Sequence, residues 1–132
     1  MAATLVRIAA GAVAFMVLDG IWLGFVMKSY YRQQLAPIVR LADGGIAPNW
    51  PAAFAVYVLL GVGIAVFSVP RAASLGSAAF SGLLLGLVIY GVYDFTNFST
   101  LKDYPLALAL VDWAWGGAAA AISTAVVWSI AR

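Results

Sequence analysis

Four long apolar stretches constrain the fold of this chain more than any other feature of its sequence. Each is about 20 residues long, the length that a helix needs to cross a hydrocarbon core of about 30 Å. They predict helices over residues 5–27, 51–69, 73–98 and 105–130. We therefore expect an all-α polytopic membrane protein, in which residues 1–132 form a single transmembrane domain with four transmembrane helices in a bundle.

The composition agrees with this fold class and narrows the possible functions. Of the 132 residues, 65% are hydrophobic and only 9% are charged, whereas ordinary globular domains have about 25% charged residues. The seven basic residues are scattered, so no basic stripe is available for a nucleic-acid partner. The chain has no Cys and no His, the usual ligands of zinc and haem. We expect no metal and no cofactor, and any chemistry must use Asp, Tyr, Asn, Ser, Thr, Lys or Arg.

The first connection, residues 28–50, is much longer than the other two. It has room for a short interfacial helix, which Pro37 would end. Tyr30, Tyr31 and Trp50 are predicted to anchor this loop at the membrane–water interface, where Tyr and Trp are enriched.

The basic residues leave the orientation in the membrane open. Four spans put both termini and the turn at 70–72 on one side, with Arg7, Arg71 and Arg132. The other side carries Lys28, Arg32, Arg40 and Lys102. Three basic residues against four do not fix the topology under the positive-inside rule. A homo-oligomer, including an antiparallel dimer, is compatible with this sequence.

Three aspartates fall inside the predicted helices at similar depth. Asp19, Asp94 and Asp112 each lie eight or nine residues from a charge that marks the same side of the membrane. The marker charges are Lys28, Lys102 and Asp103. At 1.5 Å per residue, each aspartate is about 12 to 14 Å inside its marker. The three acids are predicted to meet in one layer, provided that the third helix continues through Asn97, one turn beyond Asp94.

Small residues share helix faces with these acids, which indicates that the acids face the bundle interior. The stripes at every fourth position are Gly11, Phe15 and Asp19 on the first helix, Gly82, Gly86, Tyr90 and Asp94 on the third, and Asp112, Gly116, Ala120 and Thr124 on the fourth. The first and fourth helices also share the pattern D-x-x-W-x-G, which places Trp22 and Trp115 one turn from an acid.

Buried acids at this depth are costly, at about 2.5 to 3.5 kcal/mol each on insertion scales, so they are rarely kept without a partner or a use. Because no Arg or Lys lies near them in the helices, the three cannot all stay ionised, and we expect them to share a proton. A structural alternative is that the acids only cross-link helices by accepting hydrogen bonds from tryptophan and tyrosine.

Several motifs resemble those of a known family. The segments "DGIWLG", "YGVYDFTNFSTL" and "DWAWGG" are similar to the bacterial membrane-protein family of domain-of-unknown-function 2177. The resemblance covers most of the chain and implies a small, multi-pass protein of the bacterial inner membrane. The positions that match the family's motifs are Asp19, Trp22, Asp94, Asn97, Asp112 and Trp115.

Three functions fit these features. The first is binding or proton-linked transport of a small or amphipathic molecule. The second is an intramembrane enzyme, or an enzyme subunit, that acts on a lipid or isoprenoid by Asp acid/base chemistry. The third is a structural or accessory subunit of another membrane protein. The candidate catalytic or proton-carrying residues are Asp19, Asp94 and Asp112, and the candidate ligand-binding residues are Trp22, Tyr90, Tyr93, Asn97 and Trp115.

Overall fold

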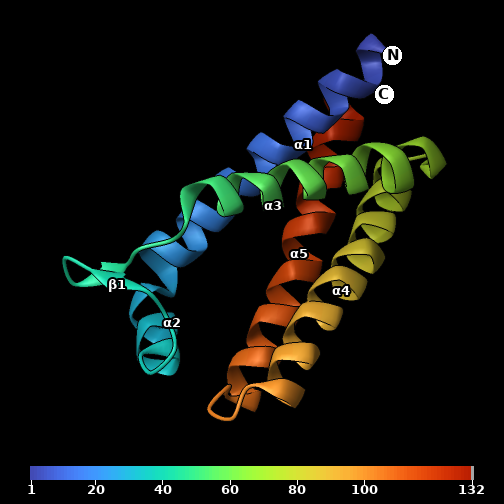
Figure 1. The fold of residues 1–132 in the computed structure, drawn as a ribbon. Coiled ribbons are helices and arrows are strands. Elements are labelled where there is room, and N and C mark those ends of the chain that lie inside the picture. Colours follow the sequence, from blue (N-terminus) through green and yellow to red (C-terminus); the bar gives the residue numbers. More distant parts are fainter. Residues whose placement is uncertain (132) are drawn as a thin grey trace.

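The computed structural model describes residues 1–131 and is almost entirely helical (Figure 1). Arg132, which the sequence predicts on the same side as Arg7 and Arg71, lies outside the described residues. The long helices are α1 (Ala2–Ile21), α3 (Trp50–Gly63), α4 (Leu75–Thr100) and α5 (Leu106–Ala131). Two of these helices continue with a different helical pitch. A π-helical segment, η1 (Trp22–Val26), follows α1, and a π-helical segment, η2 (Ile64–Ser68), and a 3-10 turn, η3 (Val69–Arg71), follow α3.

The all-α polytopic fold predicted from the sequence is confirmed. Four helical stretches are long and apolar enough to cross a membrane: Ala2–Val26, Trp50–Arg71, Leu75–Thr100 and Leu106–Ala131. Local side chains determine where two of them begin. The Asn49 side chain accepts a hydrogen bond from the backbone N–H of Ala52, which caps α3. Ser74 and Ser77 form a reciprocal capping box, so α4 begins at Leu75 rather than at residue 73.

The helix α4 continues through Asn97 to Thr100, which meets the condition for a layer of three acids. No Gly or Pro interrupts the segment from Val92 to Thr100. The helix ends where Leu101 adopts an extended conformation. Asp94 is therefore well inside the helix and does not lie in a shallow turn.

Close contacts between glycines hold the helices together along the predicted stripes. The helices α4 and α5 lie side by side as an antiparallel pair (Figure 1). A Cβ atom at Gly86 would collide with the carbonyl oxygen of Gly116, and one at Gly82 with the carbonyl oxygen of Ala120. In the same way α1 crosses α3 where Gly11 and Gly61 meet. Backbones this close are typical of membrane helix pairs.

The long first loop contains a short helix, α2 (Lys28–Leu35), which ends just before Pro37. It also contains a small hairpin that was not predicted, β1 (Leu41–Ala42) paired with β2 (Gly45–Ile46). The hairpin turn uses Asp43 and Gly44, both with positive φ, the conformation that a tight two-residue turn requires. The sequence "DG" is a typical signal for such a turn.

One of the three predicted interface anchors is wrong. Tyr31 is only 5% exposed and packs with Tyr104 and Leu108 at the start of α5. The reason is that α2 folds back against the bundle and turns this side chain inward. Trp50, in contrast, is 73% exposed, as an interface anchor requires.

Candidate functional site

The most deeply buried acid is Asp94, on α4, which is completely inaccessible to solvent. Its Oδ1 atom accepts a hydrogen bond of 2.8 Å from the hydroxyl of Tyr104, in the turn between α4 and α5. Its Oδ2 atom receives no N–H or O–H from any residue between 1 and 131. The group within hydrogen-bonding reach of Asp94 is instead the carboxyl of Asp112. Two carboxyl groups can hydrogen-bond to each other only if they hold a proton between them.

The second acid of this pair, Asp112 on α5, is tied to the first loop. The hydroxyl of Tyr31 donates a hydrogen bond of 2.5 Å to Asp112 Oδ1. The same hydroxyl accepts a hydrogen bond of 3.1 Å from the indole N–H of Trp22. Burial, followed by the charge of Asp112, raises the pKa of Tyr31 above its ordinary value. Burial and the hydrogen bond to Asp94 likewise raise the pKa of Tyr104. Both tyrosines therefore remain protonated hydrogen-bond donors.

The third acid, Asp19 on α1, has a different environment. Its Oδ1 atom accepts a hydrogen bond of 2.7 Å from the indole N–H of Trp115. The hydroxyls of Tyr57 and Tyr90 also interact with this carboxylate, and the charge of Asp112 is close enough to act on it. Asp19 is thus surrounded by neutral donors from three helices, whereas Asp94 and Asp112 rely partly on each other.

The two D-x-x-W motifs are joined in a reciprocal way. Trp115, which follows Asp112 by one turn, binds Asp19, and Trp22, which follows Asp19 by one turn, reaches Asp112 through Tyr31. Between them the two indole rings stack, with centroids 4.3 Å apart and planes 3° apart. A continuous network of rings and hydrogen bonds therefore runs from Asp19 to Asp112, and the Asp112 carboxyl lies within reach of Asp94. This connects all three acids that the sequence places at one depth.

The other predicted site residues occupy less central positions. Tyr90 packs against Gly116 and stacks near Phe15, with its hydroxyl toward Asp19. Tyr93 is 57% exposed and interacts with Asn97, which is only partly buried. Asn97 also interacts with the hydroxyl of Tyr104. Tyr93 and Asn97 therefore lie at the margin of the acid layer.

Three tyrosines of the layer were not among the predicted site residues. Tyr31 and Tyr104 come from connecting segments, and their contacts depend on how those segments pack. A signal did exist for Tyr57, because Tyr57 and Gly61 repeat on α3 the four-residue Tyr–Gly spacing that Tyr90 and Gly86 show on α4. Such a pair places a tyrosine on the face that contacts a neighbouring helix.

The three acids lack a cationic partner among residues 1–131. Within the described chain, none of the groups that act on the three carboxylates is a lysine or an arginine. Across residues 1–131, there is also no group of three acids close enough to hold a metal ion. The layer is thus a set of carboxyl groups held by neutral hydroxyl and indole donors.

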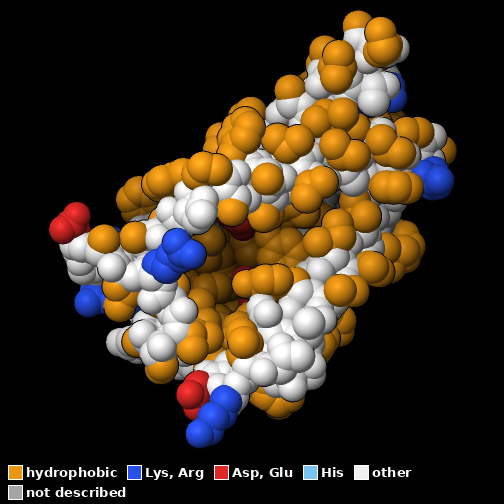
Figure 2. Space-filling model, viewed as in Figure 1, with side chains coloured by type: hydrophobic (Ala, Val, Ile, Leu, Met, Phe, Trp, Pro, Cys, Tyr) orange, Lys and Arg blue, Asp and Glu red, His pale blue; other side chains and the backbone are white. Residues whose placement is uncertain are grey.

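A hollow in the side of the molecule leads to this layer. Figure 2 shows the hollow between α3 and the α4–α5 pair, with apolar walls and acidic atoms at its floor. Asp43 and Asp103 are exposed on loops and Asp94 is completely buried, so the acidic atoms at the floor belong to Asp19 and Asp112. The axes of α4 and α5 run in the plane of this view, so the reader looks at the bundle from its side. The hollow therefore opens on the flank of the bundle and not at one of its ends.

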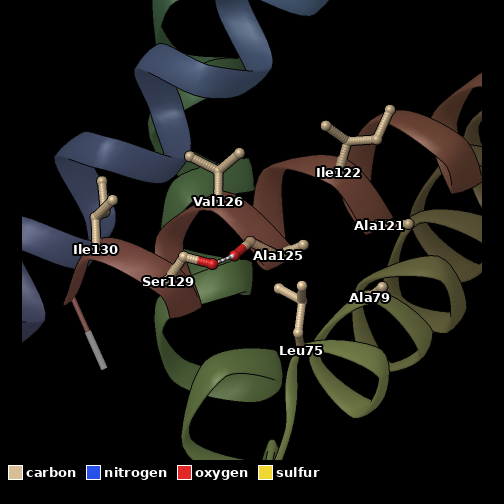
Figure 3. A pocket seen from close by; sticks show the side chains of 8 residues that line it. All are labelled: Leu75, Ala79, Ala121, Ile122, Ala125, Val126, Ser129 and Ile130. Carbon is tan, nitrogen blue, oxygen red and sulfur yellow. Dashed lines mark hydrogen bonds between the residues drawn. The ribbon is translucent and has the colours of Figure 1, made fainter.

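A second concave surface lies far from the acids. It is a groove of about 480 Å³ between the beginning of α4 and the end of α5, lined by Leu75, Ala79, Ala121, Ile122, Ala125, Val126, Ser129 and Ile130 (Figure 3). Its serine hydroxyl, that of Ser129, is bonded to the carbonyl oxygen of Ala125. Among the described residues that line this groove, none offers a free polar side chain that could position a ligand.

Comparison with known proteins identifies the family of this chain but no individual relative. No curated protein and no solved structure matches the chain. A family profile described as a predicted membrane protein, DUF2177, matches residues 4–129, which is nearly the whole sequence. This agrees with the resemblance of the "DGIWLG", "YGVYDFTNFSTL" and "DWAWGG" segments. The chain belongs to the DUF2177 family of predicted membrane proteins.

Proposed function

We propose that this membrane protein binds an amphipathic molecule in the flank hollow, with the polar end of the molecule at the aspartate layer, and that binding or transport is linked to protons. The observation that carries this proposal is a layer of three acids without a cationic partner, of which Asp19 and Asp112 reach the floor of an apolar hollow. Intramembrane acids are costly, and in membrane proteins they commonly mark substrate or proton pathways. We further propose the bacterial inner membrane as the location, as the family resemblance implies.

The shape of the hollow supports an amphipathic ligand rather than a fully polar one. Its walls are apolar and its opening is on the side of the bundle, so a molecule could reach it from the lipid phase. The polar end would then meet Asp19 and Asp112, the acids of the layer that are not completely buried. This combination of apolar walls with a few polar groups is typical of small-molecule sites.

Native mass spectrometry of protein released directly from membranes tests the proposal. We expect wild type and Asp103→Asn, which changes an exposed loop acid, to carry the same bound amphipathic molecule. Asp112→Asn and Asp19→Asn should lose most of it. Equal occupancy in all four proteins, or no bound molecule in any of them, would contradict the proposed function.

One observation favours a second candidate, an intramembrane acid/base enzyme. The Asp94–Asp112 pair resembles a carboxyl dyad in which one acid donates a proton while the other accepts one. Protonation of a double bond of an isoprenoid or unsaturated acyl chain, followed by loss of a proton to the second acid, needs no metal. Lipid profiles of a deletion strain complemented with wild type or Asp94→Asn test this candidate. Unchanged acyl and isoprenoid species in the deletion strain would exclude it.

A further inference from the structure

The polar groups around the acid layer indicate which class of amphipathic molecule it accepts. In the part of the chain that the structure describes, the donors that reach the three carboxyls are neutral, namely the hydroxyls of Tyr31, Tyr57, Tyr90 and Tyr104 and the indole of Trp115. A negative ligand group would face acids with no compensating cation. A positive group would satisfy charges that the protein itself leaves uncompensated.

A polar atom in the layer also remains without a donor. Asp94 Oδ2 is fully buried and receives no N–H or O–H from the described chain, so its one close polar partner is the carboxyl of Asp112. The pair is stable as long as a proton lies between the two acids. A cation placed beside Asp112 could take over the role of that proton, and the pair would then carry two negative charges and one bound positive charge.

Aromatic rings add to the preference for a cation. Trp22 and Trp115 stack against each other with one face each, and both side chains are partly exposed. Indole faces attract organic cations, by about 0.5 to 2 kcal/mol depending on solvent exposure. The acids and the indole rings therefore both favour a ligand with a positively charged group.

From these contacts we propose that the layer is an exchange site, in which the positive group of a lipophilic organic cation replaces the proton shared by Asp94 and Asp112. This inference rests on the proposed function and names its ligand class. One proton leaves for each cation that binds, so charge is conserved. The titratable groups that face the pair are Asp19 on α1, Tyr31 on α2, Tyr90 and Tyr93 on α4, and Tyr104 before α5.

Calorimetric titration with tetraphenylphosphonium tests this proposal on the full chain in lipid nanodiscs. Tetraphenylborate, of the same shape and opposite charge, serves as the matched probe, and protein-free nanodiscs give the background. Measurements in two buffers with different ionisation enthalpies report the number of protons released. We expect the cation to bind with release of about one proton, and its Kd to fall up to about tenfold per pH unit while the pair holds its proton.

Single substitutions test whether the released proton comes from the Asp94–Asp112 pair. Asp112→Asn should abolish proton release and weaken cation binding at least tenfold, whereas Asp103→Asn, on an exposed loop, should match wild type. If Asp112→Asn does not fold, the number of protons that the wild-type protein releases on binding tetraphenylphosphonium still tests the exchange. Cation binding without proton release, or equal binding of tetraphenylborate, would overturn the exchange proposal. Either result would leave the binding of an amphipathic molecule intact, because that part of the proposed function rests on the molecule found by mass spectrometry. Cation binding without proton release would remove only the proton linkage.

Discussion

At the scale of single residues, Tyr104 is the side chain on which Asp94 depends most. Its hydroxyl donates the one O–H that reaches Asp94 from a non-acidic residue of the described chain. Removing one partner of a buried polar group costs about 1 to 3 kcal/mol, because the remaining group stays desolvated. The tyrosine itself is 7% exposed, so water cannot easily replace its hydroxyl.

We therefore predict that Tyr104→Phe lowers the free energy of unfolding by about 1 to 3 kcal/mol. Tyr30→Phe is the matched control, because Tyr30 contacts Tyr31 through its ring and lies in the same part of the molecule. It should change stability by less than about 0.5 kcal/mol. Reversible unfolding in mixed micelles measures both variants, and an equal effect of the two would show that the hydroxyl of Tyr104 does not support Asp94.

At the scale of helices, the pairing of α4 with α5 depends on glycines at the contact. We predict that Gly86→Ala destabilises the bundle by about 1 to 3 kcal/mol, because the new Cβ would meet the Gly116 carbonyl and force the helices apart. Gly20→Ala is the control, since no atom lies within 4 Å of the Cβ it would add. The same unfolding measurement should find Gly20→Ala neutral or stabilising. A harmless Gly86→Ala would mean that α4 and α5 are not packed this closely.

The short helix α2 is held against the bundle through Tyr31. Tyr31→Phe removes both the donor to Asp112 and the acceptor of the Trp22 indole. We expect amide hydrogen exchange across Lys28–Leu35 to become about 5 to 160 times faster, which corresponds to a loss of about 1 to 3 kcal/mol in local stability. Gln33→Ala, an exposed change on the same helix, should leave the exchange rates unchanged. Equal exchange in Tyr31→Phe and wild type would show that α2 is held by other contacts.

The helices, and the closeness of the three acids to one another, could be predicted from the sequence, because both follow from simple counting. Apolar length gives the spans, and the rise per residue places Asp19, Asp94 and Asp112 at one level. The four-residue spacing of Gly82 and Gly86 identified the correct face of α4. Each of these features belongs to a single helix. A long apolar segment in a bilayer has few alternatives to a helix, because its backbone N–H and C=O groups must bond to each other there.

The connecting segments could not be predicted in the same way. Tyr31 has the sequence context of an interface anchor, and its burial follows only from the docking of α2 on α5. Tyr104 reaches Asp94 because the turn after α4 is tight. No periodic pattern or residue spacing in the sequence indicates either contact, because both depend on tertiary packing. The reciprocal bonds between Trp22, Trp115 and the opposite acids also required the helix crossing to be known.

At the scale of the whole molecule, the bundle holds one acid layer and leaves one side of it open. The α4–α5 pair is packed along its length by small residues, while the hollow separates that pair from α3 (Figure 2). The two acids of the pair come from α4 and α5, and Asp19 comes from α1. Three helices thus bring carboxyls together, and we infer that Asp94 and Asp112 share a proton.

Carbon-13 NMR of protein labelled at the aspartate carboxyls measures how many of these carboxyls are protonated at a given pH. The chain has five aspartates and no glutamate, so few resonances appear, and single Asp→Asn variants assign them. We expect Asp94 and Asp112 together to hold one proton near neutral pH, which they lose in a single coupled step. In Asp94→Asn, the Asp112 resonance should shift strongly while Asp43 does not. Five fully ionised carboxyls at neutral pH, with Asp112 unaffected by Asp94→Asn, would contradict the shared proton and the acid layer built on it.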